Sequence, residues 1–387
     1  MLRPEELKEI IIDPQETIRE LGKTIIGQDK AKRSLALLAL NRQMLVLSKF
    51  GLIGAEDILI DKTNVLLIGP TGCGKTSIVN ALSDVIDVPI TTFDITSVTE
   101  AGYIGGKVED ILERHIKKHY EHYGQNSTID FYEQRKKAGL TLQISDIRDA
   151  NTDIMETGII YIDEIDKIAD RGDHHWKGKS TYVQNELLKF LEGQEVDVGK
   201  QGHSSFSMGG PAVSKLRTHD LFFILGGAFQ GLDEIILKRL NKNSTIGFSS
   251  ALPNRSDSNV LDNVLSLVTT EDLINYGFKP EFVGRIPVRA TLSSMTEEML
   301  CSIVCSAQDS PYFRYINFLK PFGISLYMEP AGVKLIAKHA IKLETGARAL
   351  NNIFFQIFED FLVDIFSYTD NKITITESLV RERMGDL

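Results

Sequence analysis

The residues that could carry out chemistry begin with one glycine-rich segment: Gly69-Pro70-Thr71-Gly72-Cys73-Gly74-Lys75-Thr76-Ser77. The segment satisfies the pattern G-x-x-x-x-G-K-[ST]. Glycines at these positions let backbone N–H groups turn toward phosphate oxygens, and the positive end of the following helix adds to the attraction. We expect the Lys75 ammonium to reach the β- and γ-phosphates and the Thr76 hydroxyl to be a ligand of Mg²⁺. The segment therefore predicts a nucleoside triphosphate site with Mg²⁺ as cofactor.

Two carboxylates follow a second apolar run, 159–162, as Asp163 and Glu164. In open α/β sheets, ligands bind outside the carboxyl ends of the strands, where these two side chains would lie. We expect Asp163 to hold Mg²⁺, often through water, and Glu164 to polarise the attacking water. An apolar run that ends in two acids is common by itself. Combined with the phosphate-binding segment upstream, it indicates that ATP is hydrolysed and not only bound.

The elements that must position these residues form an alternating pattern. Strand and helix signals alternate from about residue 60 to 230, which predicts an α/β fold around a mostly parallel sheet. The apolar runs 64–68, 159–162 and 221–225 fit strands that are buried on both faces. The phosphate-binding segment would then join the first of these strands to a helix.

The pattern changes after Thr296. Helical stretches dominate there, with one pair of short strands, ISLYM and KITIT. These features predict a smaller, mainly helical second domain. The helical stretches lie near 296–307, 330–343 and 347–366.

Two segments are interpreted as insertions. Residues 113–157 are polar and charged and contain no strong strand pattern. Residues 240–262 are rich in Ser and Asn, which is typical of a surface loop.

Three histidines begin the first insertion at helical spacing, His115, His119 and His122. That spacing can hold a metal ion. Apolar residues share the same stripe, so we favour the flank of a packed helix face over a metal site.

Composition limits the classes of partner. The 387 residues include 43 Lys and Arg against 53 Asp and Glu, a net charge of −10. An acidic chain has no global electrostatic attraction for nucleic acid or anionic membranes, so we expect neither as a partner. The apolar stretch 35–47 contains Asn41 and Arg42 and is shorter than the ~20 residues that a membrane span needs. Three cysteines and an acidic N-terminus without an apolar run favour a cytoplasmic protein.

A set of stretches resembles the ClpX family of AAA+ unfoldases, with the HslU family next closest. The match covers roughly residues 20–365, in the same order as in the family. The stretches are IIGQDKAKR (25–33), NVLLIGPTGCGKT (64–76), VTEAGYIG (98–105), GIIYIDEIDKIADR (158–171), LLKFLEG (187–193), GGAFQGLDEII (226–236), FKPEFVGRIPV (278–288) and TGARAL (345–350).

The resemblance implies an architecture and an activity. It implies an AAA+ P-loop NTPase with a lead segment (1–21), a large α/β ATPase subdomain (22–292) and a small, mainly helical subdomain (293–387). Members form ring-shaped homohexamers that hydrolyse ATP, thread protein substrates through a central pore and deliver them to a ClpP-type peptidase.

The resemblance also implies roles for residues around the nucleotide. Arg285, in EFVGRIP, matches the arginine finger that reaches the nucleotide of a neighbouring subunit. Arg348, in TGARAL, matches the sensor-2 arginine of the small subdomain, and Ile26 lies in the segment that matches the region beside the adenine. With Glu164, the two arginines form the expected catalytic set.

Two further segments match parts of the family that contact proteins. Gly102-Tyr103-Ile104-Gly105 matches the pore loop that grips substrates. Ile246-Gly247-Phe248 matches the tripeptide that docks on the peptidase, and it lies in the Ser/Asn-rich segment. HslU lacks such a loop, so this tripeptide favours ClpX over HslU.

The chain also departs from the ClpX pattern. Typical members begin with a zinc-binding module built on four cysteines, whereas this chain has no Cys-x-x-Cys, so we expect no zinc. The RKH motif of the pore entrance is not evident between Gly199 and Asp220, and residues 113–157 are longer than expected. Two alternatives stay open: a protein-remodelling chaperone that works without a peptidase, and an HslU-like subunit.

Overall fold

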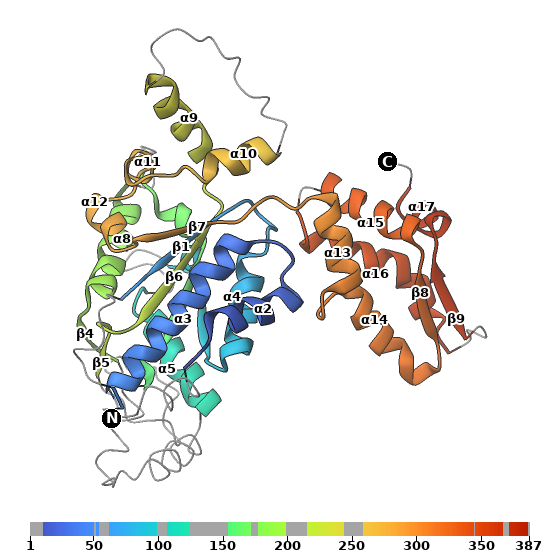
Figure 1. The fold of residues 1–387 in the computed structure, drawn as a ribbon, viewed down its shortest axis with the longest axis horizontal. Coiled ribbons are helices and arrows are strands. Elements are labelled where there is room, and N and C mark those ends of the chain that lie inside the picture. The colour runs from blue at the N-terminus through green and yellow to red at the C-terminus, as the bar shows by residue number, and fades with distance from the viewer. Residues whose placement is uncertain are drawn as a thin grey trace.

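The protein is described by a computed structural model over these residues: 11–49, 52–53, 62–98, 107–123, 154–171, 177–198, 215–243, 258–343, 345–366 and 371–385. A large lobe built around a sheet is joined to a small, mainly helical lobe (Figure 1). The large lobe's core ends at Leu292 and Met295 already packs on the core of the small lobe, so residues 292–296 connect the two.

The sheet of the large lobe is parallel, as the sequence predicts. It has five strands in the order β2-β3-β6-β1-β7, and every neighbouring pair is parallel. The three apolar runs form its centre, while the edge strands β2 and β7 carry exposed or half-buried positions and give no continuous apolar signal. The strands are β1 (Val65–Ile68), β2 (Ile90–Asp94), β3 (Ile159–Asp163), β6 (Phe222–Gly227) and β7 (Val288–Thr291).

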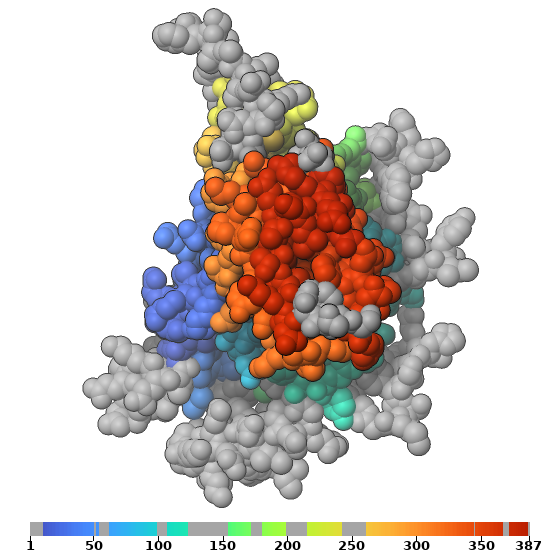
Figure 2. Space-filling view, turned by 90° about the vertical axis from the view of Figure 1, so that its right-hand side faces the viewer, coloured from blue at the N-terminus to red at the C-terminus, as the bar shows by residue number. Residues whose placement is uncertain are grey.

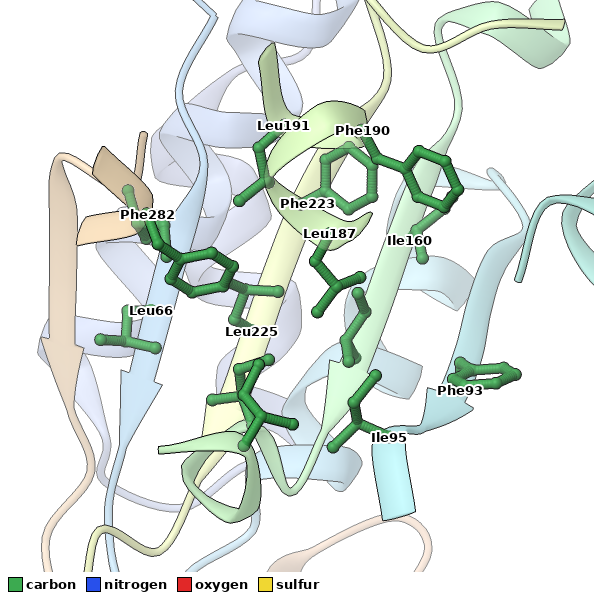
Figure 3. Close-up of a cluster of buried hydrophobic side chains, with 14 of the residues drawn as sticks. Leu66, Phe93, Ile95, Ile160, Leu187, Phe190, Leu191, Phe223, Leu225 and Phe282 are labelled. Atoms are coloured by element: carbon green, nitrogen blue, oxygen red, sulfur yellow. The ribbon is translucent and has the colours of Figure 1, made fainter. Parts of the chain in front are cut away.

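Alternate side chains of the central strands pack on opposite faces of the sheet, as expected for a period of two. Leu66, Ile160 and Leu225 face one core, which Figure 3 shows together with Leu187 and Phe282 from the covering helices. This face is covered by α5 (Asp110–Tyr123), α8 (Lys177–Glu192), α9 (Leu232–Asn243), α11 (Thr270–Tyr276) and α12 (Pro280–Gly284).

The opposite face is covered by the helices near the N-terminus. Val65, Tyr161 and Ile224 contribute to this second core. The helices are α2 (Pro14–Thr24), α3 (Asp29–Lys49) and α4 (Lys75–Ile86). The large lobe also contains α10 (Ser258–Leu265) and an antiparallel pair, β4 (Glu195–Asp197) and β5 (Lys215–Arg217).

The small lobe has a core of its own, in which Ile336, Ile353, Phe354 and Phe358 are fully buried. The three predicted helices and the predicted strand pair are present, and the two strands run parallel. The elements are α13 (Glu297–Ser306), α14 (Pro311–Leu319), β8 (Ser325–Met328), α15 (Pro330–Lys342), α16 (Arg348–Val363), β9 (Lys372–Ile375) and α17 (Glu377–Met384). Of these, the short helices α14 and α17 were not predicted.

The segment interpreted as an insertion from residue 113 begins later than expected. Residues 113–123 continue helix α5, and His115, Ile116 and His119 are buried against the sheet. Polar residues outnumber apolar ones in this stretch, which hides the packed face in the sequence. The predicted insertion also ends too late, because residues 154–157 are described and Met155, Glu156 and Thr157 are buried. Residues 124–153 lie outside the described residues.

The two buried histidines of α5 belong to the core. The Thr91 hydroxyl lies 2.9 Å from His115 Nδ1, and His115 Nε2 lies 2.9 Å from the Met155 carbonyl oxygen. That carbonyl can only accept, so His115 Nε2 donates to it. Because burial lowers the pKa of the ring to about 4, the ring is neutral at neutral pH and its Nδ1 accepts from the Thr91 hydroxyl. The His119 ring lies 4.3 Å away, centroid to centroid. Within the described ranges no cluster of three or more His, Cys, Asp or Glu side chains could hold a metal ion. The packed-face interpretation is confirmed for both histidines.

We expect His115 to make the protein less stable in acid. Burial lowers the pKa of His115 to about 4, against the effect of its bond to Met155, and the positive charges of Arg42 and Lys118 lower it further. The unfolded chain therefore binds a proton that the folded chain rejects between pH 6.5 and about 4. The free energy of unfolding should fall by about 3 kcal/mol across that window because of this group.

Chemical denaturation of the wild type and His115→Gln at several pH values measures this effect. The variant should show a flatter pH dependence than the wild type, whatever its stability at neutral pH. His219→Gln, which removes a mostly exposed imidazole, is the control. Parallel profiles for the wild type and His115→Gln would contradict the prediction.

Candidate active site

A cavity of about 280 Å³ lies between the two lobes, at the carboxyl edge of the sheet. Figure 2, viewed from the side of the small lobe, shows that lobe lying over the large lobe. From the large lobe the cavity is lined by Ile25, Ile26, Thr71, Gly72, Cys73, Gly74, Lys75, Thr76, Ser77, Asp163 and Glu164, among others. From the connection and the small lobe it is lined by Met295, Ile303, Ala307, Asp309, Pro311, Arg314, Ala347 and Arg348, among others.

The glycine-rich segment turns tightly between β1 and α4. Gly72 and Gly74 have φ values of +77° and +94°, in the left-handed region that favours glycine. Helix α4 begins at Lys75 with no acidic residue in its first turn, so its positive end is open toward the cavity. The Lys75 ammonium donates to the carbonyl oxygens of Gly69 (2.6 Å) and Pro70 (2.9 Å). Gly69 and Pro70 therefore support the lysine, while residues 71–77 line the cavity.

Thr76 and Asp163 meet in three dimensions although they lie far apart in the sequence. The Thr76 hydroxyl donates to Asp163 Oδ2 over 3.0 Å, and the Glu164 N–H donates to Asp163 Oδ1 over 2.9 Å. Glu164 has a φ of +57°, because the chain turns sharply where β3 ends. A hydroxyl beside a carboxylate is an oxygen donor set of the kind that Mg²⁺ prefers. These residues fit the expected metal.

Gly226 and Gly227, at the end of β6, leave room for neighbouring side chains whose place near the site was not predicted from the sequence. A Cβ atom on Gly226 would lie 2.4 Å from the Tyr161 hydroxyl oxygen. A Cβ atom on Gly227 would lie 2.6 Å from the Phe229 ring and 2.7 Å from Asp166 Oδ1. Burial, together with the negative charge of Asp163, raises the pKa of Tyr161. Nothing in the spacing of these residues reveals that Tyr161 reaches across from β3.

One end of the cavity is apolar and suits the face of a nucleobase. Ile25 and Ile26 follow α2, and Ile303, Ala307 and Pro311 come from the small lobe. The Gln308 N–H donates to the Lys23 carbonyl oxygen over 3.4 Å and links the two walls. The same cavity is lined by an exposed ion pair, with Arg314 Nε 3.4 Å from Asp309 Oδ1. No sequence motif identified these two residues.

The small lobe touches the glycine-rich segment directly. The Ala347 N–H donates to the Gly72 carbonyl oxygen over 3.2 Å. A Cβ atom on Gly72 would lie 2.0 Å from the Thr345 carbonyl oxygen, and one on Gly346 would lie 2.5 Å from that of Gly72. Helix α16 begins at the next residue, Arg348, which lines the cavity. The contact thus brings this arginine to the phosphate-binding segment.

Arg285 lies elsewhere. It ends helix α12, is half exposed, and does not line the cavity. Its Nη2 atom donates to Glu192 Oε1 over 3.2 Å, and its carbonyl oxygen accepts from Asn64 Nδ2 over 2.8 Å. The structure therefore does not bring Arg285 to the nucleotide cavity of its own chain.

The segments expected to contact proteins lie outside the described residues. These are Gly102, Tyr103, Ile104 and Gly105 of the expected pore loop, and Ile246, Gly247 and Phe248 of the expected docking loop.

Comparison with known proteins agrees with this geometry. Residues 60–289 match the family of AAA domains (Cdc48 subfamily). The ClpX ATP-binding subunit of the ATP-dependent Clp protease from Borrelia duttonii (strain Ly) is 34% identical over 371 residues, which cover 95% of this chain and 78% of the relative. The same protein of Borrelia recurrentis (strain A1) gives the same values.

The parallel sheet, the phosphate-binding segment and the domain match define an ATPase of the AAA class. With this identity over almost its whole length, the chain belongs to the ClpX family. Among the helices of the described ranges, none combines the length and apolar character needed to cross a membrane.

A methyl group on Gly72 should disrupt nucleotide binding. Gly72→Ala places a Cβ atom against the Thr345 backbone and also strains a backbone with positive φ. Gly231→Ala is a matched control, because Gly231 has a φ of +85° but no atom within 4 Å of its Cβ position. We expect Gly72→Ala to weaken ATP binding at least about tenfold and Gly231→Ala to leave it within about twofold. Titration with a fluorescent ATP analogue measures both, and equal affinities would contradict the proposed role of the contact.

Proposed function

We propose that this protein is an ATP-driven unfoldase that works as a homohexamer, threads proteins through a central pore and delivers them to a ClpP-type peptidase. The observation that carries the proposal is the cavity shared by both lobes, in which Lys75, Thr76, Asp163, Glu164 and Arg348 converge. A cavity of this kind can couple nucleotide state to the arrangement of the lobes. The curated relatives are ATP-binding subunits of a Clp protease, which supports the peptidase as partner.

The residues of the site have complementary roles in ATP hydrolysis. The N–H groups of the glycine-rich segment and the Lys75 ammonium bind the phosphates. Thr76 and Asp163 would hold Mg²⁺, which when bound offsets the negative charge of the phosphates. Glu164 polarises the water that attacks the γ-phosphate. Ile26 and the apolar residues beside it contact the base.

Arg285 completes the site of a neighbouring subunit. Its guanidinium is half exposed and, among the described residues, pairs with Glu192, which is also half exposed, so the pair is weak and can open when a neighbour binds. Arginine fingers supplied in trans are worth about 10³–10⁵ in rate. Turnover therefore requires an oligomer. Arg348 contacts the nucleotide from the small lobe, so that a change in the bound nucleotide changes the position of that lobe.

The remaining roles follow the family. Gly102, Tyr103, Ile104 and Gly105 grip the substrate in the pore, and Ile246, Gly247 and Phe248 dock on the peptidase. We place the boundary between the subdomains at residues 292 and 293, after the last buried residue of the large lobe's core. ATP and Mg²⁺ are the proposed cofactors, without zinc, and the proposed compartment is the cytoplasm.

Mixing two inactive variants tests whether Arg285 acts in trans. Glu164→Gln lacks the group that polarises water, and Arg285→Ala lacks the finger, so each homohexamer should lose at least about 99% of turnover. In mixed rings, a Glu164→Gln subunit offers its intact Arg285 to an Arg285→Ala neighbour, which retains Glu164. We expect ATPase activity to reappear on mixing. Activity that stays at the level of the separate variants would contradict action in trans.

Substitution of Tyr103 should separate ATP hydrolysis from mechanical work. Tyr103→Ala should keep ATPase activity within about twofold and lose at least about 90% of the unfolding of a fluorescent protein substrate. Tyr327→Ala, which removes an exposed tyrosine of the small lobe, is the control. Unimpaired unfolding by Tyr103→Ala would contradict the pore role.

Removal of Phe248 should uncouple the peptidase while leaving unfolding intact. We expect Phe248→Ala to lose at least about 90% of partner-dependent proteolysis, whereas Phe318→Ala, at an exposed phenylalanine of the small lobe, should not. Proteolysis that survives in Phe248→Ala would refute the docking role. If the wild-type protein unfolds substrates but binds no peptidase, the peptidase-independent chaperone replaces the proposed function.

A further inference from the structure

Gln28 makes a buried polar contact that none of the roles above uses. Its side chain lies between the glycine-rich segment and the connection of the lobes, with only 6% of the residue exposed. Its Nε2 atom donates to the carbonyl oxygens of Cys73 (3.2 Å) and Ser293 (2.9 Å). Its Oε1 atom accepts from the Ser293 N–H over 2.8 Å. One amide therefore binds three backbone groups from two distant segments.

The backbone that carries Gln28 is unusual as well. Gln28 has a φ of +61°, next to Gly27 with a φ of +68°. A non-glycine residue in the left-handed region costs on the order of 1 kcal/mol or more and persists only where its surroundings enforce it. The turn directs the amide away from helix α3 and into the space between Cys73 and Ser293.

The contact with Cys73 determines how the phosphate-binding segment is oriented. The C=O and N–H groups of a trans peptide point in opposite directions. Holding the Cys73 carbonyl against Gln28 therefore directs the Gly74 N–H to the other side, where Gly74 lines the cavity. The preceding carbonyl, of Gly72, is held by Ala347 of the small lobe. Two consecutive carbonyls are thus bound, one by Gln28 and one by the small lobe.

The contact with Ser293 holds the connection between the lobes. The next residue, Ser294, is held separately by Asp262 of α10, which accepts from the Ser294 N–H over 2.8 Å and from its hydroxyl over 3.1 Å. The hydrogen bonds of the two residues differ in one respect. Those of Asp262 go to Ser294 of the connection, whereas those of Gln28 go to the connection and to the phosphate-binding segment.

We propose that Gln28 is a positioning residue for ATP binding, which joins the phosphate-binding segment to the connection between the lobes through a single amide. This role rests on the proposed nucleotide site. It requires a group that donates and accepts at once, so glutamine suits the position and neither a carboxylate nor an apolar side chain can replace it.

Steady-state ATPase kinetics of three variants test the proposal. Gln28→Ala removes the amide and leaves buried carbonyls unpaired, so the ATP concentration at half-maximal rate should rise about tenfold while kcat stays within about twofold. Gln28→Glu keeps the shape but cannot donate when ionised, so the same rise is expected at pH 8. Part of it should be recovered toward pH 6, because a protonated carboxyl regains one donor. Gln28→Ala should show no such recovery.

Asp262→Ala is the matched control, because it loosens the same connection and removes no hydrogen bond to the phosphate-binding segment. It should leave half-saturation within about twofold. An equal rise in Asp262→Ala and Gln28→Ala would overturn the proposal, since a loosened connection would then explain both. Unchanged half-saturation in both Gln28 variants would also overturn it. If the wild type itself neither binds nor hydrolyses ATP, the proposed function fails, and the inference with it.

Discussion

The contact between Gly72 and Gly346 is the constraint on which the rest of the structure depends. Two glycines with positive φ bring the phosphate-binding segment and the small lobe so close that neither position has room for a Cβ atom. The contact places Arg348, at the start of α16, in the same cavity as Lys75 and Thr76. The cavity therefore belongs to both lobes, and its shape depends on their relative orientation. The proposed coupling of ATP hydrolysis to movement rests on that dependence.

The large lobe contributes the chemistry from one edge of its sheet. Parallel strands end at the same edge, so the segment after β1 meets the acids that end β3. The hydrogen bond between the Thr76 hydroxyl and the Asp163 carboxylate joins the two segments at this edge. Tyr161 fills the space beside Gly226, which explains why this position has no room for a side chain. Arg285 pairs with Glu192 and does not line the cavity. Its position agrees with the proposal that it completes the site of a second subunit.

The central strands could be predicted because strands buried on both faces leave continuous apolar runs. Three small-lobe helices, α13, α15 and α16, could be predicted because amphipathic helices leave periodic apolar patterns. The continuation of α5 to Tyr123 could not be predicted. Its buried face includes His115 and His119, and these polar residues interrupt the apolar pattern of a packed helix. The glycine-rich segment and the acids after β3 were predicted, since their chemistry demands fixed residue types. Gln28 had a place in a family motif, but its bonds to Cys73 and Ser293 depend on chain segments that only folding brings together.

The most direct test of a cavity shared by two lobes is ATP affinity after the loss of the small-lobe arginine. Equilibrium titration of Arg348→Ala with ATP and Mg²⁺ should show binding weakened about tenfold or more, because a charged contact to the phosphates is lost. Arg381→Ala, which removes an arginine of the same lobe that pairs with Glu377, should bind as the wild type does. Wild-type affinity in Arg348→Ala would contradict the account, because the large lobe would then bind the nucleotide alone.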